Sequence, residues 1–168
     1  SLIHGQNLTN VHVTGANGTI DGNGHVWWSH KVHNDTPPHL LEVMWSFNIK
    51  VSNLTFKNSP FWTIHPVYTR GFHAHDLRII NPTNVSNTDG IDPDSTSDVL
   101  IESVYIRTGD DGIAIKSGWD EYGYGLGIPS SNITVRACNI TTPCAAIAIG
   151  SEMSGGASNI TVTDCQLY

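Results

Sequence analysis

The chain has 168 residues, of which 39% are hydrophobic and 14% charged, and its formal net charge is −7. This length and apolar content suit one domain with a sizeable core and exclude an intrinsically disordered chain. The acidic balance argues against a nucleic-acid binder, which normally presents a basic surface. No apolar run approaches the roughly 20 residues that span a bilayer, so we expect no membrane partner.

A turn followed by a short strand recurs along the chain and is the main structural signal. Each phrase opens with Asn or Asp and then alternates apolar and polar residues, as a half-buried strand does. The phrases begin at Asn10, Asn48, Asp76, Asp98, Asn132 and Asn159. Without a helical periodicity of comparable strength, this repeat favours a parallel β-solenoid, whose stacked turns bury a continuous core. A β-sandwich also uses many short strands and is the main competing fold.

A second repeated phrase fixes a register. Residues 89–91 and residues 111–113 both read Asp-Gly-Ile, at an offset of 22. An offset of one turn makes the two phrases stacked neighbours. Extending this register to both sides, with a step of 29 before Ile91, predicts one apolar ladder. It consists of Trp62, Ile91, Ile113 and Ile147.

Three carboxylates gather in one place if this register holds. Asp89 and Asp111 lie on adjacent strands, about 4.8 Å apart, and Asp110 precedes Asp111. Like charges this close raise at least one pKa. A protonated acid beside an ionised carboxylate is what glycoside hydrolysis requires. A calcium site is the alternative, because Asp92 and Asp94 add further oxygen ligands.

The two aspartate motifs resemble a known family. Residues 87–92 and 109–111 resemble the Asn-Thr-Asp and Gly-Asp-Asp signatures of glycoside hydrolase family 28, the polygalacturonases. Residues 58–66, 116–122 and 150–156 resemble its plant and exo-acting bacterial branch. The resemblance covers most of the chain.

This resemblance implies a fold and an activity. The fold is all-β, a right-handed parallel β-helix of the single-stranded pectin-lyase-like type. Residues 1–168 are then a single β-helix domain, a fragment of a longer catalytic domain. The implied activity is inverting hydrolysis of the α-1,4-galacturonosyl linkages of pectin. A calcium-dependent pectate lyase and a non-catalytic β-helical pectin-binding module remain alternatives.

The resemblance also implies roles for individual residues. Asp110 is expected to be the general acid, and Asp89 and Asp111 are expected to orient and deprotonate water. Asn87 is expected to bind substrate with the first motif. The family's Gly-His-Gly motif corresponds to residues 150–152, which contain no His. The family's later Arg-x-Lys motif lies beyond the end of the chain.

Two further residues are expected to bind substrate. Lys116 follows Asp94 by 22 residues and His65 precedes it by 29, so the register places all three on the face of the aspartates. Lys116 suits a galacturonate carboxylate, and a Lys116–Asp94 ion pair is the alternative. His65 suits a sugar carboxylate or hydroxyl, and a packing role is the alternative. We expect no cofactor and no metal, because the nine His lack the spacing of a zinc site.

Eight Asn-x-Ser/Thr sequons are possible glycan acceptors in a secreted protein. They start at Asn7, Asn17, Asn34, Asn53, Asn84, Asn132, Asn139 and Asn159. With the family resemblance, they favour a secreted, monomeric glycoprotein that acts on pectin in the cell wall.

Overall fold

The structure is a computed structural model that describes residues 1–28 and 36–168, so the sequon at Asn34 lies outside the described residues. Two short helices accompany the strands. In chain order the elements are β1 (Ile3–Gln6), β2 (Thr9–Asp21), α1 (His25–Trp28), β3 (Leu41–Met44), β4 (Phe47–Lys57), β5 (Ile64–Val67), β6 (Arg70–Ile80), β7 (Ser97–Arg107), β8 (Ile113–Ile115), α2 (Asp120–Leu126), β9 (Ser130–Arg136), β10 (Asn139–Thr141), β11 (Ile147–Ile149), β12 (Ala157–Thr163) and β13 (Gln166–Leu167). Neither of these helices is long and apolar enough to cross a bilayer.

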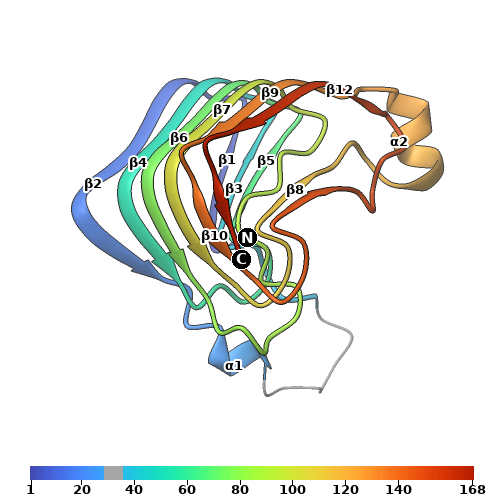
Figure 1. Cartoon of the computed structure of the whole chain (residues 1–168). Helices are drawn as coiled ribbons and strands as arrows, with labels where there is room; N and C mark the ends of the chain where they lie inside the picture. Colours follow the sequence, from blue (N-terminus) through green and yellow to red (C-terminus); the bar gives the residue numbers. More distant parts are fainter. Residues whose placement is uncertain (29–35) are drawn as a thin grey trace.

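The strands stack as coils of a right-handed parallel β-helix, which confirms the predicted fold (Figure 1). One sheet runs in the order β12-β9-β7-β6-β4-β2, and β10 joins it beside β7. We call the other the site sheet. It contains β1-β3-β5 and β8-β11, which parallel bridges through Ile91 and Asp94 join into one surface. The two sheets enclose one apolar core.

Core residues stack in ladders from coil to coil. On the site sheet, Ile64 pairs with Ile91, Ile91 with Ile113, and Ile113 with Ile147. The predicted ladder is therefore confirmed from Ile91 onward and wrong at Trp62. The step before Ile91 is 27 residues rather than 29, because the intervening loop is shorter than the alignment assumed. Trp62 is only half-buried and lies outside this ladder.

The corners of the coils explain why Asn and Asp open the repeated phrases. One column of corner residues has φ between 52° and 74°, the left-handed region that Asn, Asp and Gly tolerate best. This column consists of Asn10, Asn48, Gly71, Asp98, Asn132 and Asn159. Side-chain amides also bond along it, as Asn132 Nδ2 does to Asp98 Oδ1 at 2.7 Å. Every coil thus turns at the same place.

The phrase that was predicted to start at Asp76 belongs elsewhere. Ile49 pairs with Phe72, so Gly71 is the counterpart of Asn48. Asp76 has a φ of 52° and lies in a second column of corners with Asn53 and Ser103. The alignment was wrong here because Gly adopts the left-handed corner without the side chain on which the pattern depends.

Candidate functional site

The two Asp-Gly-Ile phrases are stacked neighbours at one edge of the site sheet. The Gly90 N–H donates to the Asp111 carbonyl at 3.0 Å, and the Ile91 N–H to the Gly112 carbonyl at 3.1 Å. The offset of 22 is therefore confirmed. A Cβ added to Gly90 would lie 2.3 Å from the Gly112 carbonyl oxygen, so close coil stacking requires the glycine. This stacking brings Asp89 next to Asp110 and Asp111.

Backbone N–H groups orient the carboxylates of the second phrase. Asp110 Oδ2 accepts the Asn87 N–H at 2.8 Å, and its Oδ1 accepts the Asp111 N–H at 3.0 Å. Asp111 Oδ1 accepts the Ala145 N–H at 3.0 Å. Asp110 and Asp111 are partly exposed, and the exposed Cys144 thiol lies within 4.8 Å of both carboxylates. The sequence gave no signal for Cys144 here.

Burial sets the first phrase apart from the second. Asp89 is only 4% exposed, and burial, followed by the charge of Asp110, raises its pKa to about 7. Asp92 is fully buried, and burial, followed by the charge of Asp89, raises its pKa well above the usual value. Asp89 Oδ1 and both Asp92 oxygens have no hydrogen-bond partner among the described residues. Near neutral pH the four aspartates, with Asp110 and Asp111, therefore hold protons that ordinary aspartates release.

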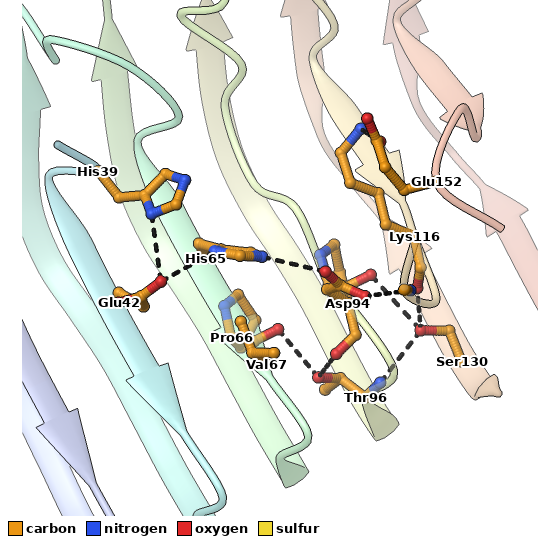
Figure 2. A network of polar contacts seen from close by, with 12 residues as sticks. His39, Glu42, His65, Pro66, Val67, Asp94, Thr96, Lys116, Ser130 and Glu152 are labelled. Carbon is orange, nitrogen blue, oxygen red and sulfur yellow. Dashed lines mark hydrogen bonds and ion pairs between the residues drawn. The ribbon is translucent and has the colours of Figure 1, made fainter. Parts of the chain in front are cut away.

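A second group of titratable side chains follows the site sheet away from the aspartates, and we call it the histidine cluster: His39, Glu42, His65 and Asp94 (Figure 2). His65 Nε2 lies 3.4 Å from Asp94 Oδ2, and His65 Nδ1 lies 3.3 Å from Glu42 Oε1. His39 Nδ1 lies 3.2 Å from the same Glu42 oxygen. The predicted proximity of His65 to Asp94 is confirmed, although the register is 27 and pairs Val67 with Asp94. The sequence gave no signal for His39 or Glu42.

Charges in the histidine cluster alternate in sign. Burial lowers the pKa of His65, but the Asp94 and Glu42 carboxylates outweigh it and the net pKa is raised. The bond with His65 holds the pKa of Glu42 well below its usual range. Burial and the neighbouring positive charge of His65 lower the pKa of His39 to about 4. His39 is therefore neutral near pH 7.

Lys116 lies beyond Asp94 on the same sheet and finds a different partner. Its ammonium donates to Glu152 Oε2 at 2.6 Å and lies 4.5 Å from the centre of the Trp62 ring. The alternative of a Lys116–Asp94 ion pair is wrong, because the two are joined only as backbone neighbours. Burial lowers the pKa of Lys116, but Glu152 and the aspartates outweigh it and raise it. Glu152, which occupies the place of the family's missing His, thus neutralises a buried cation.

A cavity of about 390 Å³ lies over these residues, and Trp62, Asn87, Asp94, Trp119 and Glu152 contribute to its lining. A second hollow of about 460 Å³ shares Asn87 with it. The two hollows meet at Asn87, whose backbone holds the Asp110 carboxylate. A groove with carboxylates at its centre and aromatic rings on its wall can hold a sugar chain and exchange protons with it.

Comparisons with known proteins agree with this geometry. The model of the family "Glycosyl hydrolases family 28" matches residues 1–168. A "Probable polygalacturonase" of Vitis vinifera is 48% identical over 98% of this chain and 34% of its own length. An "Endo-polygalacturonase" of Pectobacterium parmentieri is 34% identical over 89% of this chain and 39% of its own length. The chain thus spans about a third of the length of such relatives.

Solved structures repeat the fold. A hyperthermoactive exopolygalacturonase from Thermotoga maritima superposes with a TM-score of 0.87 at 30% identity, covering 96% of this chain and 45% of that one. A polygalacturonase from Erwinia carotovora ssp. carotovora gives a TM-score of 0.84 at 31% identity, covering 98% and 45%. With a family model that matches from the first residue to the last, this chain belongs to glycosyl hydrolases family 28.

Proposed function

We propose that this chain carries the acid–base site of a polygalacturonase, which hydrolyses the α-1,4-galacturonosyl linkages of pectin with inversion. The observation that carries the proposal is the stacking of Asp89 on Asp110 and Asp111 at the centre of a groove. Family membership and relatives named as polygalacturonases support it. Residues 1–168 are then a β-helix segment of a longer catalytic domain, in keeping with the share of the relatives that they span.

The environment of each aspartate supports a division of labour. Asp110 is partly exposed and oriented by two backbone N–H groups, which suits a general acid that must reach the leaving oxygen. Asp89 has a pKa of about 7, and a base with a pKa near the working pH removes a proton from water most effectively. Asp111 completes the pair that positions the water.

The predicted substrate-binding residues lie along the same groove. Asn87 borders both hollows, so its side chain is available to a sugar. Lys116 is 4% exposed and already paired with Glu152, so a galacturonate carboxylate reaches its charge only by sharing it with Glu152. His65 is 6% exposed, and a substrate group would compete with two carboxylates for its ring nitrogens. Of the three, Asn87 is the residue most open to substrate.

Secretion, action in the cell wall, a monomeric state and glycosylation complete the proposal. Of the described sequon asparagines, all except Asn139 are exposed. The Asn132 amide donates to Asp98, and Asn159 donates to Asn132 at 3.1 Å, so a glycan at either residue would disturb a corner column. Asn84, in the loop that lines the second hollow, carries no such constraint in the corner columns.

The test is hydrolysis of polygalacturonic acid by the catalytic domain that contains this chain, with Asp110→Asn and Asp98→Asn as matched variants. Asp98 lies on β7, in the opposite sheet, where it pairs with Arg70. We expect reducing ends from the wild type, inversion at the anomeric carbon by NMR, and a loss of about 100-fold or more only in Asp110→Asn. Equal rates in the two variants would remove Asp110 from its role.

Product chemistry separates the other functions. Unsaturated products that absorb ultraviolet light and disappear on chelation would indicate a calcium-dependent lyase in place of a hydrolase. Binding of pectin without any product would indicate a non-catalytic module. Either outcome would refute the proposal.

A further inference from the structure

The histidine cluster is built like a metal-binding site. His39 Nδ1, His65 Nδ1 and a Glu42 carboxylate oxygen all lie within 4.8 Å of one another, on three separate turns of chain between residues 39 and 65. Two imidazoles and one carboxylate form a ligand set that zinc uses in proteins, with a fourth position left for water. The spacing of these residues along the chain hides the set, because only the stacking of coils brings them together.

The distances fit shared coordination better than direct ion pairs. Glu42 Oε1 lies 3.2 Å from His39 Nδ1 and 3.3 Å from His65 Nδ1. Two ligands about 2.0–2.1 Å from a tetrahedral zinc ion lie about 3.3–3.4 Å apart. A charge-assisted hydrogen bond from His to a carboxylate is about 2.7–2.9 Å. The remaining edge, between His39 and His65, needs a modest closing movement.

An unpartnered buried nitrogen points into the cluster. His65 is only 6% exposed, and its Nδ1 makes no hydrogen bond of acceptable geometry to any described residue. A buried polar atom without a partner costs about 1–3 kcal/mol. A bound cation at this position would satisfy it.

Outer partners hold the ligands in the orientation that a metal requires. His65 Nε2 faces Asp94 Oδ2 at 3.4 Å, and Asp94 Oδ1 accepts the Gly118 N–H at 2.8 Å (Figure 2). The other oxygen of Glu42 accepts the Ser1 hydroxyl at 2.6 Å and faces His4 Nδ1 at 3.0 Å. A carboxylate behind a ligand histidine is the usual second shell of a zinc site, because it fixes the tautomer of the ring.

We propose that His39, Glu42 and His65 form a binding site for a divalent transition metal, with zinc as the ion that the donor set fits. The ion links the chain before β3 to β3 and to β5. It takes the place of the proton that His65 shares between two carboxylates. The His39 ring also packs 5.4 Å from Phe61 and 5.2 Å from Trp62, so the ion fixes the aromatic wall of the groove.

The test is Zn²⁺ binding by the tag-free, chelator-stripped protein, followed by titration calorimetry and by the visible spectrum of the Co²⁺ form. We expect one ion per chain, and a Co²⁺ spectrum of tetrahedral type with high absorption. Asp94→Asn should weaken binding about 10- to 100-fold, as loss of an outer partner does. His39→Gln should weaken it more, since it removes a ligand.

Two variants serve as controls. His73→Gln removes another histidine that faces a carboxylate, Glu102 at 2.9 Å, in the opposite sheet. Cys144→Ser removes the thiol of the second candidate ligand group, which contains Asp110 and Asp111. Both should bind Zn²⁺ like the wild type. No binding by the wild type, a six-coordinate Co²⁺ spectrum, or a loss of affinity in Cys144→Ser instead of His39→Gln would overturn the proposal.

Discussion

The aspartates of the proposed catalytic site and the histidine cluster lie on the same sheet but treat a carboxylate in opposite ways. Around Asp89 the neighbours are other carboxylates and apolar core, so burial and like charge raise its pKa to about 7. Around Glu42 the neighbours are histidines, so its pKa is held well below the usual range. The protonation of a carboxyl group is therefore set by its neighbours in adjacent coils rather than by its residue type.

The sharpest way to break this comparison is to neutralise one carboxylate of each kind. Asp89→Asn should stabilise the protein at pH 8 by as much as about 4 kcal/mol, the cost of ionising a group whose pKa rises from 3.8 to about 7. The folded state binds the Asp89 proton more tightly than the unfolded state, so wild-type stability falls as pH rises between these two values. The gain in the variant should vanish near pH 4. Urea unfolding at several pH values measures it.

Asp98→Asn is the matched control for that experiment. Asp98 is paired with Asn132 and Arg70, which lower its pKa, so the variant should show no gain in stability at pH 8. A gain in Asp98→Asn equal to that in Asp89→Asn would show that net charge, and not burial, is responsible.

Glu42→Gln should have the opposite sign, with a loss of about 2 kcal/mol. The contribution of Glu42 is lost as pH falls below 4.5, because its folded pKa is depressed. The contribution of His65 is lost as pH rises above 6.5 and through its raised pKa. The loss in the variant is therefore largest between pH 4.5 and 6.5. NMR titration of His65 should show a lower pKa, and an unchanged His65 titration would refute the pairing.

The smallest effect should come from the Lys116–Glu152 pair. Glu152→Gln should cost about 1 kcal/mol, because Lys116 keeps the Gly150 carbonyl and the Trp62 ring as partners. Glu102→Gln removes the carboxylate of a more exposed pair with Arg136 and should change stability less. Denaturant unfolding of both variants compares them, and a larger loss in Glu102→Gln would contradict the assigned importance of burial.

The sequence predicts the fold and the aspartates well because both depend on repetition. Two identical Asp-Gly-Ile phrases, 22 residues apart, were enough to place Asp89 beside Asp111. The prediction fails where repetition does not mark the position. Trp62 was misplaced because loop lengths differ between coils, and Asp76 was misaligned because Gly71 carries no side-chain signature.

The partners of the functional side chains were harder to predict than their positions. Glu42 belongs to no motif, and it meets His65 only because β3 and β5 are adjacent. Glu152 reaches Lys116 across 36 residues, and its direction depends on a loop rather than on a strand. A sequence pattern gives the face on which a residue lies, but the geometry of long side chains on loops needs coordinates.

The corner columns have a consequence for how the groove can vary. Asn48, Asp98 and the other corners fix each turn of the backbone, so the coils keep their stacking although Ile91 and Ile113 are separated by 22 residues and Ile113 and Ile147 by 34. The longer coil places its surplus in α2 and its flanks, where Trp119 joins the groove wall (Figure 1). Wall height is thus a parameter independent of the scaffold, and grafting a longer or shorter segment there should reshape the groove without altering the packing beneath it.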